Sequence, residues 1–424
     1  MNETTAHLDS ERPANLQNRI GVWALAAANG ISQLGNTVTY LAVPWFVLTT
    51  TGSASRTGVA SAMFAVATIA SGLTIGNLID HIGFRRMSIL ADALSGVTVL
   101  AIPVLYLLDW LTFWQLLVLI FLGSYFDTPG NTARGALTPA LANVSRMPLE
   151  RANSAIRMAG VAGGIILGPL IFGVLSATIG TVNLLFVDAG TFAVSILVVA
   201  LLVRAPLITQ PEVEDESVKQ GKLDVFLAGF RFLFRDSVMR TVLPTTALYG
   251  FILSAYFGVV LPVYVDDQFG EPAYLGTLIA ALGGGSLVGI LLYGAVGHRY
   301  GRYSTLLVIS AVSAAAIWLF TVPAYLPTDL VAMFIFGFAT GPFNPLMRTI
   351  LQKRTPERLL GRVLNALFTL ASITPPLGLL IAGIAIDTFG LQPVQYTAAI
   401  LISLVPLWVA LAPWPRRAAP AFEG

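Results

Sequence analysis

The segment GNLIDHIGFRR, at residues 76–86, guides the interpretation of the whole chain because it recurs in altered form as GAVGHRYGR at residues 294–302. In both copies two glycines stand seven residues apart and basic residues follow. A second pair of short matches, PGN at 129–131 and PFN at 342–344, lies further along each half. Two related halves are typical of membrane transporters, in which the substrate binds between the repeats near the middle of the bilayer.

The composition indicates that lipid is part of the solvent around this chain. Hydrophobic residues make up 56% of the 424 residues and charged residues only 11%, and the mean hydropathy is +0.78. A soluble protein carries roughly 25% charged residues, so the charges here are too few to cover a soluble surface. The formal net charge of +2 gives no reason to expect nucleic-acid binding.

Long apolar stretches predict an all-α membrane protein of twelve transmembrane helices in two pseudo-symmetric six-helix bundles. A membrane-spanning helix needs about 20 apolar residues, and a spanning segment must be helical because bare backbone amides cannot face lipid. The predicted spans are 20–48, 55–79, 87–108, 112–137, 152–177 and 181–203 in the first half, and 239–265, 273–296, 303–323, 329–350, 359–386 and 392–413 in the second.

These spans divide the chain into five predicted parts: a tail at 1–19, a first bundle at 20–204, a linker at 205–238, a second bundle at 239–413 and a tail at 414–424. The first tail lacks the apolar core of a secretory signal, so the first span is predicted to be retained. In the linker, Phe226, Phe230, Leu233 and Phe234 share one helical face, which fits a helix lying in the membrane interface. A solvated linker is the alternative for residues 207–220.

The distribution of basic residues predicts that both termini lie in the cytoplasm. Arginine and lysine gather on the side of the N-terminus, as at Arg85, Arg86 and Arg299, whereas the opposite side holds Arg56 and scattered acids such as Asp387. Cytoplasmic segments of membrane proteins carry an excess of Lys and Arg, and an even number of spans returns the C-terminus to the same side.

The repeated segment resembles the loop signature of the major facilitator superfamily, which reads roughly G-x-L-A-D-R-x-G-R-K. The residues that fit are Gly76, Leu78, Asp80, Gly83, Arg85 and Arg86. Phe84 stands where the family usually has arginine, and His298 replaces the acid in the second copy. In span five, AGGIILGPLIFG at 162–173 is similar to the G-x-x-x-G-P-x-x-G-G signature of drug exporters, although its last glycine is displaced.

Two longer stretches narrow the resemblance. Residues 36–92 are similar to the Tap-like multidrug efflux pumps of actinobacteria, and the start of span eleven is similar to the macrolide-efflux and enterobactin-exporter branch. The resemblance implies a proton-driven exporter of amphipathic drugs or similar small molecules, acting as a monomer by alternating access in the bacterial inner membrane. The alternative is an exporter of a siderophore or another secreted metabolite.

The resemblance also implies a cytoplasmic gate. In the family, an acid at the place of Asp80 holds the cytoplasmic side closed against the start of helix eleven, where the helix dipole favours an anion by ~0.3–1 kcal/mol. The predicted gate residues are Gly76, Asp80, Gly83, Arg85, Arg86 and, in span four, Arg134. An ordinary charged loop is the alternative for Asp80.

A polar stripe runs along span one. Asn29, Gln33, Asn36 and Tyr40 recur at spacings of four, three and four residues, so they share one helical face. Such a face avoids lipid, and it lines the substrate cavity or bonds to neighbouring helices. Further predicted cavity residues are Tyr249, Tyr256, Asn344 and Asn365.

Three acids inside the spans, Asp188, Asp127 and Asp92, are predicted to couple transport to protons. A charge at the bilayer centre costs ~2.5–3.5 kcal/mol on insertion scales, so each needs a partner or a water-filled cavity. Asp127 lies seven residues before Arg134 on one helical face, so a structural ion pair between them is the alternative.

Small residues and prolines predict a pivot in spans five and eleven. Gly160, Gly164 and Gly168 fall at every fourth position, which lets helices approach closely, and a proline removes a helical hydrogen bond. The predicted pivot residues are Gly164, Gly168, Pro169, Pro375 and Pro376. Simple close packing is the alternative.

The sequence argues against an enzyme, a metal site or a cofactor. The chain has no cysteine, and His7, His81 and His298 lie far apart. The segment GGGS at 283–286 lies inside an apolar stretch and not after a strand, so it does not resemble a phosphate-binding loop.

Overall fold

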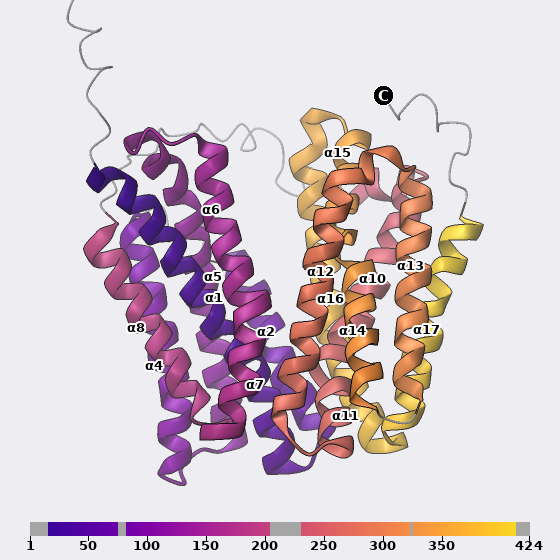
Figure 1. Cartoon of the computed structure of the whole chain (residues 1–424), viewed down its shortest axis with the longest axis horizontal. Helices are drawn as coiled ribbons and strands as arrows, with labels where there is room; N and C mark the ends of the chain where they lie inside the picture. Colours follow the sequence, from indigo (N-terminus) through magenta and orange to yellow (C-terminus); the bar gives the residue numbers. More distant parts are fainter. Residues whose placement is uncertain (1–15, 75–81, 204–229, 323–324, 413–424) are drawn as a thin grey trace, which may run out of the picture. The chain divides into compact units, whose positions relative to one another are not determined.

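The computed structural model describes residues 16–74, 82–203, 230–322 and 325–412, and all regular structure in these ranges is helical (Figure 1). The side chains of residues 16–19, 357, 358 and 365 are also outside the described part. The predicted interfacial helix of the linker falls mostly on residues 204–229, outside the described ranges. Of its apolar face, Leu233 is buried and Phe234 is 57% exposed.

The first half of the sequence forms six long helical stretches. They are α1 (Leu16–Thr51), α2 (Ala54–Thr74), α4 (Phe84–Leu107), α5 (Phe113–Val144), the run α6 (Leu149–Val161), η2 (Ala162–Leu167) and α7 (Gly168–Ile179), and α8 (Leu184–Leu202). Each overlaps one predicted span.

The second half forms a matching set of six. They are α10 (Met239–Ala255) with η4 (Tyr256–Val260) and α11 (Leu261–Gln268), α12 (Pro272–Val296) with η5 (Gly297–Arg299), α13 (Arg302–Trp318) with η6 (Leu319–Thr321), α14 (Leu326–Thr340) with α15 (Phe343–Arg354), α16 (Glu357–Phe389), and α17 (Leu391–Leu411). Within the described residues, the predicted twelve helical stretches are therefore confirmed.

Ten of these stretches are long and apolar enough to cross a membrane by length and composition. The other two are α1 and α5, with 36 and 32 residues. Both carry the polar side chains of the site described below, which lower their apolar content. They are long enough to span a bilayer core, because about 20 helical residues suffice.

The chain divides into two compact units that do not follow the boundary between the sequence halves. One unit contains Met1–Thr37, Ala70–Gly164 and Leu185–Pro211, and the other contains Val38–Ile69, Ile165–Leu184 and Glu212–Gly424. The second unit thus includes the end of α1, most of α2 and α7, together with the helices of the second sequence half. Contacts between the two halves of the sequence therefore exist inside this unit.

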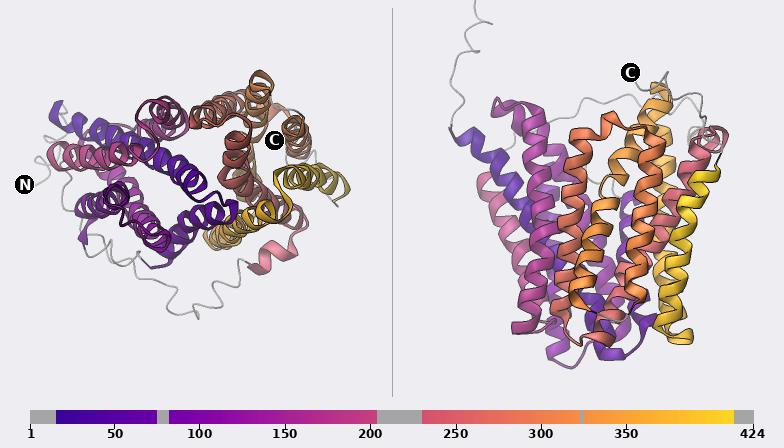
Figure 2. Two further views of the ribbon diagram at one scale, coloured as in Figure 1. Left: turned by 90° about the horizontal axis from the view of Figure 1, so that it is seen from below. Right: turned by 45° about the vertical axis from the view of Figure 1, so that its right-hand side comes forward.

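Glycines allow very close packing of α12 on α14, which run side by side in Figures 1 and 2. A Cβ atom added to Gly285 or Gly289 of α12 would overlap a backbone carbonyl of α14. The same holds in reverse for Gly337 of α14, and for Gly341 directly after it, against α12. Small residues at a helix crossing let the backbones meet and gain packing energy inside a membrane.

A π-helix lies in span five at the predicted pivot. The segment η2 ends just before Gly168 and Pro169, which begin α7. Wider π turns absorb residues that cannot make the regular helical hydrogen bond, and a proline lacks the N–H that such a bond needs. The predicted pivot role of these residues stays a prediction.

In α16 the helix continues through Pro375 and Pro376. Pro375 cannot donate to the carbonyl of Ala371, four residues earlier, and the hydroxyl of Thr374 donates to that carbonyl instead, at 3.3 Å. The hydroxyl of Ser254 on α10 donates to the Pro375 carbonyl at 2.9 Å. Side-chain hydroxyls thus stabilise the proline pair inside an apolar segment.

Candidate functional site

A buried ion pair joins α4 and α5 in the first compact unit. The Nη1 atom of Arg134 lies 2.8 Å from Oδ1 and 3.0 Å from Oδ2 of Asp92, and both residues have 0% exposure. The Ser195 hydroxyl of α8 donates to Asp92 Oδ2 at 2.7 Å. The Nη2 atom of Arg134 donates to the Ser32 hydroxyl of α1 at 3.2 Å. Four helices thus meet at one pair of charges.

Asn131 extends this pair toward Asp127. Its Oδ1 accepts from Arg134 Nη2 at 3.0 Å and from Gln33 Nε2 of α1 at 3.0 Å, and its Nδ2 donates to Asp127 Oδ2 at 2.8 Å. Asn36, on the next turn of α1, interacts with the same carboxyl. We call Ser32, Gln33, Asn36, Asp92, Asp127, Asn131, Arg134 and Ser195 the polar network.

Helix geometry explains how these side chains come together. Asp127, Asn131 and Arg134 stand at i, i+4 and i+7 on α5, so they share one face. Gly130 lies against Ala91 of α4, where an added Cβ would sit 3.1 Å from the Ala91 Cβ atom. This close approach of α4 and α5 brings Asp92 within reach of Arg134.

Two members of the polar network have a buried polar atom without a hydrogen-bond partner among the described residues, namely the Nε atom of Arg134 and the carboxylate Oδ1 atom of Asp127. With both acids ionised, Asp92, Asp127 and Arg134 together carry one net negative charge, whereas protonation of Asp127 makes the group neutral. Because charge inside a bilayer is costly, this arrangement can take up a proton at Asp127.

The spacing of Asp127 and Arg134 suggested a direct ion pair between them. In the structure these two side chains do not contact each other directly. Seven helical residues advance by about 10 Å along the axis, which is too far for a direct contact. Asn131 bridges the two side chains, and the ion pair of Arg134 is with Asp92.

Asp188, the third predicted proton carrier, is fully buried on α8 and its Oδ1 accepts from the Thr191 hydroxyl at 3.0 Å. It packs directly against Gly35 of α1, where a Cβ atom would overlap both Asp188 Oδ1 and the Thr191 hydroxyl. The glycine is therefore required for α8 to bring this acid beside α1.

The other stripe residues of α1 have separate surroundings. The Asn29 amide donates to the Ile156 carbonyl of α6 at 3.3 Å. This residue thus bonds to a neighbouring helix, which was the alternative to lining a cavity. Tyr40 is 37% exposed and its ring contacts Phe64 edge-to-face, with centroids 5.4 Å apart. The structure thus brings Gln33 and Asn36, but not Tyr40, into the polar network.

Among the described residues, the predicted cavity residues of the second half have different surroundings. The Tyr249 hydroxyl lies 2.6 Å from that of Ser313, with Tyr249 2% exposed. Tyr256 is 1% exposed and its hydroxyl has no partner among the described residues. Asn344 is exposed near the start of α15, and the side chain of Asn365 is outside the described part.

The predicted cytoplasmic gate is described only in part, because Gly76 and Asp80 fall outside the described residues. Gly83 has φ +83°, which a glycine adopts without strain. The guanidinium of Arg85 donates to the Ala200 carbonyl at 2.6 Å, near the end of α8, where a cation is favoured. Arg86 is exposed. Arg134 lies in the polar network.

Sequence reasoning overlooked Asn131, Ser32 and Ser195. Asn131 is the last residue of the repeated PGN motif, and its counterpart in the second copy, Asn344, was predicted to be functional. A comparison of the two repeats could therefore have predicted a functional role for Asn131. The two serines have no such signal, since a single serine in an apolar helix is common.

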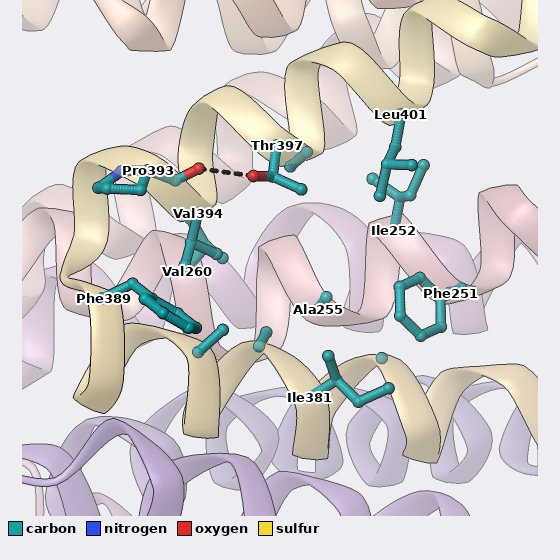
Figure 3. Close-up of a pocket in the computed structure, with 14 residues that line it drawn as sticks. Phe251, Ile252, Ala255, Val260, Ile381, Phe389, Pro393, Val394, Thr397 and Leu401 are labelled. Carbon is teal, nitrogen blue, oxygen red and sulfur yellow. Dashed lines mark hydrogen bonds between the residues drawn. The ribbon is translucent and has the colours of Figure 1, made fainter.

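A separate apolar cavity of about 490 Å³ lies in the second unit between α10, α16 and α17 (Figure 3). Its walls include Phe251, Ile381, Phe389 and Val394. Its polar side chain, Thr397, donates its hydroxyl to the Pro393 carbonyl at 2.8 Å. The cavity contains none of the predicted substrate residues, and its surface suits the apolar part of a ligand.

No group of three or more His, Cys, Asp or Glu residues in the described part of the chain could hold a metal ion. The described site thus consists of helix-borne polar side chains.

Comparison with known proteins identifies the family. The family model "Major Facilitator Superfamily" matches residues 25–373 and 251–423. The chain is 35% identical over 367 residues to the multidrug efflux pump Tap of Mycolicibacterium fortuitum, covering 84% of this chain and 87% of that protein. It is 31% identical over 308 residues to the enterobactin exporter EntS of Escherichia coli O127:H6, covering 72% and 70%.

A solved structure confirms the fold. The crystal structure of the nucleoside transporter NupG aligns with a TM-score of 0.78 over 94% of this chain and 99% of that one, at 14% identity. At this identity the likeness concerns the fold alone. The family match, the similarity to the Tap pump and the apolar helices show that this chain is a multi-pass membrane transporter of small molecules and not an enzyme, and that it belongs to the major facilitator superfamily.

Proposed function

We propose that this protein is a proton-coupled exporter of amphipathic small molecules that works by alternating access in the bacterial inner membrane, with both termini in the cytoplasm. The observation that carries the proton coupling is the buried Asp127 oxygen, which has no hydrogen-bond partner in the described part of the chain and lies at the end of the polar network. Export of drugs is supported by the similarity to the Tap pump.

The polar network supplies a route from protonation to helix position. When Asp127 is ionised it holds Asn131, which also contacts α1 through Gln33 and the ion pair through Arg134. A proton on Asp127 weakens its acceptor strength toward Asn131 and removes the net negative charge. The bonds between α1 and α5 then change with the protonation state, as coupling requires.

An amphipathic substrate fits the sparse charges of the spans, because apolar walls with few polar groups favour such molecules. A second candidate, export of a siderophore or another secreted metabolite, is supported by the similarity to the enterobactin exporter. The two candidates differ in the substrate and share the same coupling residue.

The test is transport by purified protein in liposomes with an imposed pH gradient and a fluorescent amphipathic cation. The wild type should accumulate the dye when the gradient is applied, and a protonophore should abolish accumulation. Asp127→Asn should lower gradient-driven accumulation at least tenfold and leave downhill dye flux within about twofold, since a lost coupling group removes a step and not the binding site.

Asp109→Asn is the matched control, because it makes the same chemical change at an exposed loop residue. Asp109 has φ +58°, a conformation that asparagine also adopts readily. Unaltered gradient-driven accumulation in Asp127→Asn would overturn the coupling role. Failure of the wild type to move dyes, with movement of a catechol siderophore, would favour the second candidate.

A further inference from the structure

The carboxylate of Asp387, near the end of α16, caps the N-terminus of α2. Its Oδ1 accepts from the backbone N–H of Ala54 at 2.8 Å. Its Oδ2 accepts from the backbone N–H of Ser55 at 2.9 Å and from the Ser53 hydroxyl at 2.8 Å. Both oxygens are therefore used, and all three donors belong to the start of one helix.

This cap connects the two halves of the sequence. The first N–H groups of a helix have no partner within the helix, and the residue that usually satisfies them stands just before it in the chain. Here Asp387 is more than 330 residues away. A carboxylate is also favoured by the helix dipole at this end, and its hydrogen bonds are charge-assisted.

Close backbone packing surrounds the cap. One turn before Asp387, a Cβ atom on Gly383 would sit 2.5 Å from the Ala54 carbonyl oxygen. One turn earlier again, the Leu379 carbonyl oxygen would lie 2.5 Å from a Cβ atom on Gly58 of α2. The row at positions 379, 383 and 387 thus lies along α2, and the contact is specific to this arrangement of the two helices.

A hydrogen bond deeper in the same contact supplies a reporter position. The Ser61 hydroxyl of α2 donates to the Gly258 carbonyl of η4 at 3.0 Å, and Ser61 is 1% exposed. Separation of α2 from the second sequence half would break this bond and expose Ser61.

We propose that Asp387 is a positioning residue of the transport cycle: by capping α2 it holds the outer ends of α2 and α16 together, and the cap must break for the protein to open outward. This inference rests on the proposed alternating access and topology. It gives the same two helices an outer charge–dipole contact opposite the inner one that sequence analysis predicts for Asp80.

The experiment uses the full chain, which has no cysteine of its own, with Ser61→Cys as the single thiol and a membrane-impermeant maleimide as the probe. Asp387→Asn keeps the side-chain shape, removes the charge and places an amide N–H against backbone donors. We expect the labelling rate of Ser61→Cys to rise about two- to fivefold in that variant, since the cap no longer favours the closed state.

The dependence of the labelling rate on salt distinguishes a charge contact from simple packing, because packing alone is insensitive to ionic strength. The cap is exposed, so raising the ionic strength should screen it and speed labelling in the otherwise wild-type protein. The same change should have little effect when Asp387→Asn is present. Asp387→Glu, which keeps the charge, should restore part of the protection.

Two controls separate opening from damage. Asp267→Asn neutralises another exposed acid on the same predicted side, whose carboxylate accepts a hydrogen bond from the neighbouring Gln268, and this change should leave labelling unchanged. A single thiol introduced by Ser310→Cys reports unfolding, because Ser310 is fully buried within α13 and should stay unlabelled in every variant.

The outcomes distinguish this inference from the proposed function. If labelling of Ser61→Cys rises during driven transport in wild type but Asp387→Asn does not change it, the cap has no positioning role and the cycle stands. If Ser61→Cys never labels under driven transport, the alternating cycle itself is overturned, and the cap with it. Equal labelling gains at Ser61→Cys and Ser310→Cys would show that Asp387 only maintains the fold.

Discussion

Replacement of Arg134 by methionine tests the buried ion pair, because methionine keeps an unbranched side chain and removes the charge. The variant leaves Asp92 with 0% exposure and a single remaining partner, the Ser195 hydroxyl. It also removes a donor from Asn131 and from Ser32. Removing one member of a buried ion pair costs about 3–5 kcal/mol of unfolding free energy, and we expect Arg134→Met to fall in this range.

A double-mutant cycle separates the pair from the rest of the network. Asp92→Asn alone removes the carboxylate of the ion pair from Arg134 and should cost about 3 kcal/mol. With Arg134→Met added, neither charge of the Asp92–Arg134 pair is left without the other, so the double variant should recover about 2–3 kcal/mol relative to the sum of the single changes. Unfolding of the purified protein by denaturant in detergent micelles measures these free energies.

The second ion pair of the described chain is the matched control. Arg354 lies 2.9 Å from Asp236, with side-chain exposures of 26% and 18%. Asp236 keeps its bonds to the backbone N–H groups of Val238 and Met239 without the arginine. Arg354→Met should therefore cost about 0–1 kcal/mol. A loss below about 1 kcal/mol for Arg134→Met, or full additivity in the cycle, would refute the reasoning.

The remaining predictions concern packing and buried hydroxyls. Gly285→Ala should lower the unfolding free energy by about 1–3 kcal/mol, because its Cβ would overlap the backbone of α14. The neighbouring Gly284→Ala has open space and should be neutral or stabilising by up to about 1 kcal/mol. Denaturant unfolding compares the two variants, and equal effects would contradict the crossing geometry. Tyr264→Phe should cost about 1–3 kcal/mol, because its hydroxyl donates to the buried Asp329 at 2.8 Å. Tyr256→Phe should be neutral or stabilising, since its buried hydroxyl has no partner among the described residues, and a large loss in thermal unfolding of this variant would show a missing contact.

The positions of the spans could be predicted because apolar length is a local property of the sequence. The predicted spans differ from the observed helices mainly at their ends, where polar residues continue a helix beyond its apolar core. The span predicted at 112–137 is the helix Phe113–Val144, and the span predicted at 329–350 is the run from Leu326 to Arg354. Helical periodicity also predicted which face of α1 is polar, as Gln33 shows.

The partners of these residues were decided by tertiary structure. Arg134 pairs with Asp92, 42 residues away, and not with Asp127 on its own helix, because helix rise separates the latter pair and the close approach at Gly130 brings α4 near. In the sequence, Asp387 is likewise one of several acids scattered on the predicted outer side. Its role as the cap of α2 depends on which helix ends meet, and such a meeting arises from packing between distant segments that no local pattern encodes.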